Sequence, residues 1–105
     1  MKLVVITVIA EFDKTVKKIL KEANVLSYSY RDVKGYRDST EDAVETNWFG
    51  SEMNETESLV FFAFVAKQNV ETLFDLVAKF NAKQETVSHI HTAVLTVEKH
   101  NSYDK

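Results

Sequence analysis

The chain has no cysteine, no proline and only two glycines among its 105 residues. Without thiols it can form neither disulfides nor thiolate metal sites, and it offers no cysteine nucleophile. With so little glycine it also lacks a Gly-rich loop that would wrap a phosphate group. These absences exclude several classes of site and are compatible with a reducing compartment.

Other absences concern membranes and nucleic acids. No apolar run approaches the ~20 residues needed to span a bilayer. The first residues, MKLVVITVIAEFDK, run directly into an acidic amphipathic segment in place of a small-residue cleavage site, so we interpret them as a strand rather than a signal peptide. The net charge is −3 and no basic cluster occurs, which argues against nucleic acid as a partner. We expect a cytoplasmic protein that is not inserted in a membrane.

The spacing of apolar residues predicts one domain over residues 1–105. Continuous or alternating apolar runs are typical of strands, and three- and four-residue spacing is typical of amphipathic helices. The predicted strands are 3–10, 25–36, 58–67 and 86–100, and the predicted helices are 12–23 and 70–80, the second with Asn69 as its N-cap. The order β-α-β-β-α-β predicts an α+β fold, a ferredoxin-like sandwich with a long loop between strands two and three.

The strand composition also predicts the arrangement of the sheet. Segments 3–10 and 58–67 are continuously apolar, so we expect them at the centre, parallel to each other, with the other two strands at the edges. Two helices cover only one face of such a sheet. Exposing the other face would cost roughly 1.5 to 3 kcal/mol for each large apolar side chain. We therefore expect a homo-oligomer in which sheet packs on sheet.

A family resemblance is carried by DVKGYR, Asp32 to Arg37. This run resembles the E-V-K-G-F-G run at the root of the long T-loop in PII signal-transduction proteins, and the resemblance extends over residues 1–100. It implies a homotrimer with the sheets facing inward and a small effector bound between subunits. In that reading the intersubunit cleft is lined by Lys34, Gly35, Tyr36, Arg37, His89 and His91.

The motifs by which PII proteins bind ATP and 2-oxoglutarate are absent. No Gln stands soon after the Val-Lys-Gly run, where YRDSTED follows, and NAKQETVSHIH lacks the family's T-G-x-x-G-D-G-K phosphate loop. No Tyr for uridylylation occurs between residues 37 and 57. The cofactor or effector therefore stays unknown.

The excursion 37–57 corresponds to the T-loop. It is strongly acidic, which can simply keep a loop solvated. Apolar side chains of the kind that anchor interfaces also occur in it: Val44, Trp48, Phe49 and Met53. By the resemblance, we expect this segment to engage a target protein, for example a membrane transporter as in related families.

An alternative resemblance is to CutA, the divalent-cation tolerance protein. The run NWFGSEMNETESLVFFAFVAK, residues 47–67, resembles that family's W-x-G followed by an acidic turn and an apolar strand. It implies a trimer that binds a divalent metal. His89 and His91, two apart on a predicted strand, would then face the same way and share one ion, with loop acids or a second copy supplying the other ligands. The other reading is two imidazoles that hydrogen-bond locally.

Catalytic motifs are absent. The sequence has no Ser-His-Asp order and no H-E-x-x-H pair. A ferredoxin-like fold with Tyr28, Tyr30 and the two histidines around a pocket would suit a small monooxygenase, but fold alone does not establish that activity. We expect a protein that is not an enzyme.

Overall fold

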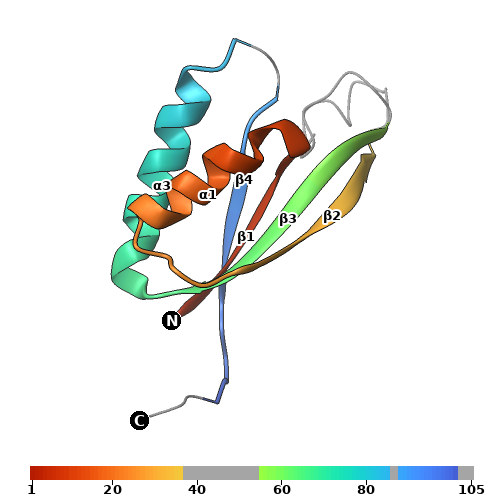
Figure 1. The fold of residues 1–105 in the computed structure, drawn as a ribbon. Helices are drawn as coiled ribbons and strands as arrows, with labels where there is room; N and C mark the ends of the chain where they lie inside the picture. The colour runs from red at the N-terminus through yellow and green to blue at the C-terminus, as the bar shows by residue number, and fades with distance from the viewer. Residues whose placement is uncertain (37–54, 86–87, 102–105) are drawn as a thin grey trace.

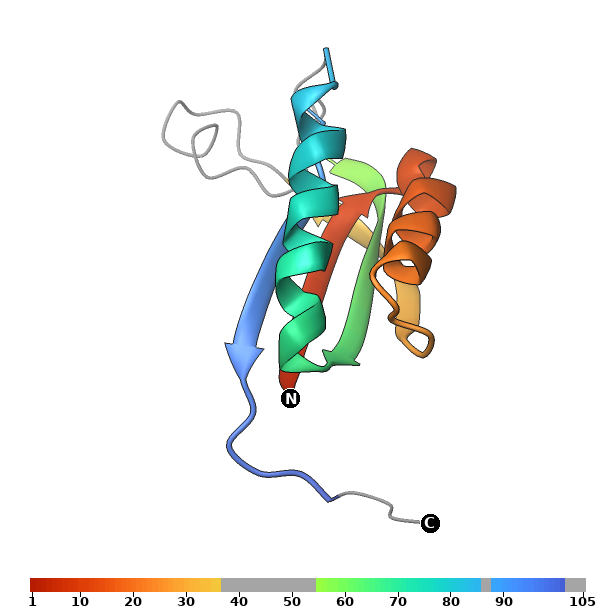
Figure 2. The same ribbon diagram turned by 90° about the vertical axis from the view of Figure 1, so that its left-hand side faces the viewer.

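The computed structural model describes residues 1–36, 55–85 and 88–101. Its elements follow the predicted order, with a short 3₁₀ turn added after the first strand. They are β1 (Lys2–Ile9), η1 (Ala10–Phe12), α1 (Asp13–Glu22), β2 (Ser29–Tyr36), β3 (Glu55–Val65), α3 (Lys67–Ala82) and β4 (His91–Thr96). Both helices lie on the same side of the sheet (Figures 1 and 2). Neither described helix is long and apolar enough to cross a membrane.

The sheet has the strand order β2-β3-β1-β4, so the two apolar strands are central as predicted. The prediction that β1 and β3 are parallel was wrong, because every neighbouring pair is antiparallel. The crossover through α1 links β1 to β2, and these two strands run parallel to each other without being neighbours. Strand β3 returns from β2 and fills the space between them, so it must run against both.

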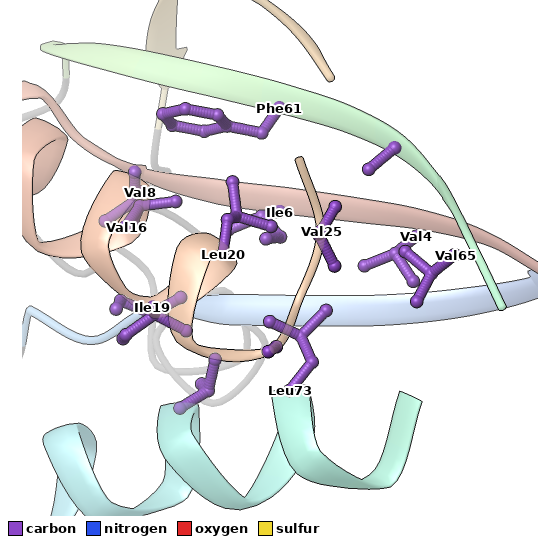
Figure 3. Packing of buried hydrophobic residues seen from close by; sticks show 14 of the residues in the cluster. Val4, Ile6, Val8, Val16, Ile19, Leu20, Val25, Phe61, Val65 and Leu73 are labelled. Carbon is purple, nitrogen blue, oxygen red and sulfur yellow. The ribbon is translucent and has the colours of Figure 1, made fainter. Parts of the chain in front are cut away.

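The core lies between the helices and one face of the sheet. Alternate residues of β1, namely Val4, Ile6 and Val8, point into it, and Phe61 of β3 is fully buried beside them. The helices contribute Val16, Ile19, Leu20, Leu73 and Val77. Figure 3 shows these apolar side chains meeting between strands and helices. This face, which we call the core face, takes alternate residues of both central strands.

The end of α1 explains why β2 begins at Ser29 rather than at residue 25. Asn24 has a left-handed backbone with φ 62°, its N–H donates to the carbonyl of Lys21, and the N–H of Val25 donates to the carbonyl of Leu20. These bonds form a Schellman motif, in which an apolar residue after the helix packs against the last turn. Val25 is accordingly buried and belongs to the helix end.

Helix α3 begins earlier than predicted. Its N-cap is Ala66, with no side-chain cap, so the prediction of Asn69 as N-cap was wrong. Asn69 lies in the first turn, where its N–H donates to the carbonyl of Ala66. The prediction failed because it placed the start of the helix at its first apolar residue, Val70. Polar first-turn residues extend the helix before that stripe begins.

Candidate functional site

The second face of the sheet, which we call the open face, carries no helix. Pairing across the strands places Leu95, Leu3 and Phe64 in one row and Ala93, Val5 and Phe62 in the next. Phe62 is 42%, Phe64 58% and Leu95 47% exposed. The expected apolar second face is therefore present, and in a single chain it is open to solvent.

The next row along the open face is polar. It runs His91–Thr7–Val60–Arg31 across all four strands, at the end of the sheet where β1 and β2 end and β4 begins. The open face thus changes from apolar at one end to polar at the other. Among the described strand residues that face this way, His91 and Arg31 are the only ionisable ones, and none is a carboxylate. This end of the face favours an anion over a cation.

His91 is half-buried, and burial lowers the pKa of its imidazole, with a further decrease from the nearby charge of His89. However, β4 begins at His91, so the prediction that both histidines lie on one strand was wrong for His89. That prediction took a long Val- and Thr-rich run as all strand, whereas pairing with β1 begins only at Thr7 and His91.

The segment before β4 is held by Asn81, in the last turn of α3. The Nδ2 of Asn81 donates to the carbonyl oxygen of Ile90 at 2.9 Å, and the N–H of Ile90 donates to Oδ1 of Asn81 at 2.8 Å. Ile90 itself is 3% exposed, within the core. Sequence reasoning missed Asn81. The available signal was a polar residue in the i, i+4 stripe that Leu73 and Val77 define.

Metal-ligand side chains do not gather. Within residues 1–36, 55–85 and 88–101, no group of three or more His, Asp or Glu side chains is arranged to hold an ion. The two histidines thus supply at most part of a zinc site, which needs three or four protein ligands.

A ribbon that projects beyond the rest of the described sheet carries three of the predicted cleft residues, Lys34, Gly35 and Tyr36. Strand β1 makes its last pair between Ile9 and Ser58, whereas β2 and β3 continue for three more rows, ending at Tyr36 and Glu55. The ammonium of Lys34 lies 3.5 Å from Oε1 of Glu57 across this ribbon. Both groups are exposed, so the pair contributes little stability.

The predicted site residues form two groups. Lys34, Gly35 and Tyr36 lie together on β2, and His89 and His91 lie together at the start of β4. The two groups are on opposite edge strands, whose axes are three strand spacings or ~14 Å apart, and Lys34 also lies three residues beyond Arg31, which shares a row with His91. Arg37 lies outside the described residues. So do the four residues predicted to bind a partner, namely Val44, Trp48, Phe49 and Met53.

A second missed contact fastens α1 to the sheet. The ammonium of Lys17 donates to the hydroxyl of Tyr30 at 2.9 Å, lies 4.4 Å from the centre of its ring, and is 3.0 Å from Oδ1 of Asp13. The Tyr30 ring stacks on Phe61 with 5.0 Å between ring centres. The bonds from Tyr30 and Asp13 raise the pKa of Lys17 above its ordinary value. Lys17 and Tyr30 are thirteen positions apart, so no local pattern in the sequence predicted this contact.

Comparison with known proteins gives matches among solved structures only. No model of a protein family matches the chain, and no curated protein sequence matches it. One similar structure is CPII, a nitrogen regulatory PII-like protein from Thiomonas intermedia K12, solved bound to ADP, AMP and bicarbonate. The TM-score is 0.59 with 16% identity, over 93% of this chain and 94% of that one.

Another is a DUF3240 family protein from Shewanella baltica OS155, with a TM-score of 0.65 and 10% identity, over 98% of this chain and 96% of that one. In both cases nearly the whole of each chain is covered, so the likeness concerns the complete arrangement of strands and helices. The chain has a PII-like fold.

Proposed function

We propose that this protein is a trimeric PII-like regulator, not an enzyme, that binds a small effector between subunits. Its 37–57 segment then engages a target protein in the cytoplasm, for example a membrane transporter. The PII-like fold supports a mechanism of this kind. The PII-like protein CPII, whose structure is similar, is bound to ADP, AMP and bicarbonate in that structure.

The observation that carries this proposal is the separation of the two groups of site residues. A cleft within one chain cannot join Lys34 on β2 to His91 on β4, because two central strands lie between them. When subunits are arranged in a ring, the β2 edge of one copy adjoins the β4 edge of the next. Each boundary then contains one complete set of residues, and a ring of three has three equivalent clefts.

The open face supports the same assembly. Phe62, Phe64 and Leu95 stay in water in a single chain, and burying them against other copies removes about 25 cal/mol of unfavourable free energy per Å². The row containing His91 and Arg31 then lies at one end of the buried face. Because it lacks carboxylates, it suits an effector with anionic character.

The target-binding part of the proposal depends on the sequence of segment 37–57. Trp48 and Phe49 are residue types that anchor protein interfaces. Substituting Trp48 by Ala should leave the assembly intact and weaken binding to a target. Unchanged target binding would argue against this role of the segment.

The first test is the mass in solution together with ligand-dependent thermal stability. Light scattering should give three times 12.0 kDa. ADP, AMP and bicarbonate, tested separately, should raise the unfolding temperature if they bind only the folded state, and Lys34→Ala should remove the increase. A monomer at all concentrations, or no response to any of the three, contradicts the proposal. A response to zinc or copper that is lost in His89→Ala would favour the metal-binding alternative.

A further inference from the structure

The register of strand β4 on β1 is poorly determined by the burial of its own side chains. Strand β4 is a six-residue edge strand paired only with β1, and its consecutive residues Val94 and Leu95 are 42% and 47% exposed. Val94 faces the helices and Leu95 the open face, so burial distinguishes the two sides poorly. Thr92 and Ala93 are likewise both half-buried.

A strand with this pattern is prone to slip. A shift of one residue against β1 would turn every side chain of β4 to the other face. His91 and Leu95 would then face the helices, and Thr92 and Val94 would join the open face. Some contact outside the strand must therefore fix the register.

The contact between Asn81 and Ile90 has the required chemistry. A carboxamide offers one donor and one acceptor side by side, as a peptide group does, and Asn81 uses both on the N–H and C=O of a single residue. Those two bonds hold the backbone immediately before β4, and the Ile90 side chain is anchored in the core. Asp lacks the donor and Leu lacks both groups.

We infer that Asn81 is a positioning residue that sets the register of β4 on β1, and so decides which β4 side chains belong to the open face. The placement of His91 in the effector cleft rests on the proposed function above. The register itself does not, and it is measured on the protein without any effector.

The test compares Asn81→Leu, which keeps the size of the side chain, with Asn69→Leu in the first turn of the same helix. By NMR, wild type and Asn69→Leu should show cross-strand contacts between Thr7 and His91 and slow amide exchange at Ile90. Asn81→Leu should lose about tenfold or more of the protection at Ile90, since two hydrogen bonds are removed, and should weaken or shift the Thr7–His91 contacts. Unchanged protection and register in Asn81→Leu overturn the inference.

Asn81→Asp keeps the inference testable if the Leu variant does not fold. An ionised carboxylate has no donor for the carbonyl of Ile90, whereas a protonated one restores it and matches the shape of the carboxamide. Lowering the pH from 7 to 4 should therefore increase the protection factor of Ile90 in this variant, but not in wild type. The absence of any such recovery contradicts a role for the donor and acceptor pair.

The mass of the same variants separates this inference from the proposed function. If the wild type is a trimer, Asn81→Leu should shift it toward 12.0 kDa, because the open face is altered. If the wild type is a monomer while Asn81→Leu still loses its register, the proposed function fails and the role of Asn81 stands.

Discussion

The two faces of the sheet both carry large apolar side chains on the central strands, but their surroundings are opposite. Val4, Ile6 and Phe61 on the core face are buried under two helices, whereas Phe62 and Phe64, on the same strand as Phe61, are exposed. Apolar content therefore indicates that a strand belongs in the centre of a sheet, but not what covers it. One face is completed by this chain, and in our proposal the other is completed by its copies.

The sharpest way to test this comparison uses adjacent residues of β3. Phe61→Ala should lower the free energy of unfolding by about 3–5 kcal/mol, because it leaves a cavity under the helices. Phe62→Ala should lower the free energy of unfolding of the single chain much less. It should weaken the association of the subunits, so that the assembly dissociates at a higher protein concentration. Denaturant unfolding at two protein concentrations distinguishes them, and equal effects would contradict the division into two faces.

A charge on the open face should separate the subunits. Phe64 is 58% exposed in the single chain, so Phe64→Lys should fold with an unchanged circular dichroism spectrum. In an assembly the ammonium would be desolvated without a partner, so the mass should fall from that of a trimer to 12.0 kDa. A variant that keeps the wild-type mass would show that this face is not the contact between copies.

The pH dependence of stability should reveal the one half-buried imidazole of the open face. The folded protein favours neutral His91, because burial and His89 lower its pKa. The stability that neutral His91 gives the fold is fully present at a pH above the ordinary histidine pKa of 6.5. It is lost as the pH falls below 6.5 toward the lower pKa of the folded state. Unfolding temperatures between pH 7.5 and 5 should thus decline less steeply in His91→Gln. Exposed His100 provides the control, since His100→Gln should keep the wild-type slope.

The smallest effect should come from the contact between α1 and β2. Tyr30→Phe removes the hydroxyl that accepts from Lys17 but keeps the ring on which Phe61 stacks. Lys17→Met removes the hydrogen bond, the charge over the ring and the ion pair with Asp13. We expect a slightly lower unfolding temperature for Tyr30→Phe and a larger decrease for Lys17→Met, measured in low salt. The reverse order would show that neither the charge over the ring nor the ion pair with Asp13 adds stability.

The sequence predicted this fold well where the physical cause is periodic. The continuously apolar runs of β1 and β3 predicted that both faces of the central strands are apolar, and the order of elements predicted the ferredoxin-like sheet. It failed where the cause is a pairing between distant segments. The direction of β3 relative to β1 depends on which strand fills the central position, and the start of β4 depends on contacts with α3 and β1.

The candidate site divides in the same way. Asp32 to Arg37 is a local run and could be recognised, and the two histidines were visible as a pair. Asn81 was not found, because its role depends on a backbone group nine residues away. Helix ends are intermediate: Asn24 is a residue type that accepts a left-handed backbone, so its position could have warned that residues 25–28 are not yet strand.

The projecting ribbon of β2 and β3 gives the molecule a lever. Its three extra rows extend ~10 Å past the end of β1 and, among residues 1–36, 55–85 and 88–101, no third strand pairs with them. A ribbon of two strands bends and twists more easily than a sheet of four. A small rotation about the row where Val33 pairs with Ser58 therefore moves the far end of the ribbon, at Tyr36 and Glu55, by a distance that grows with the length of the ribbon.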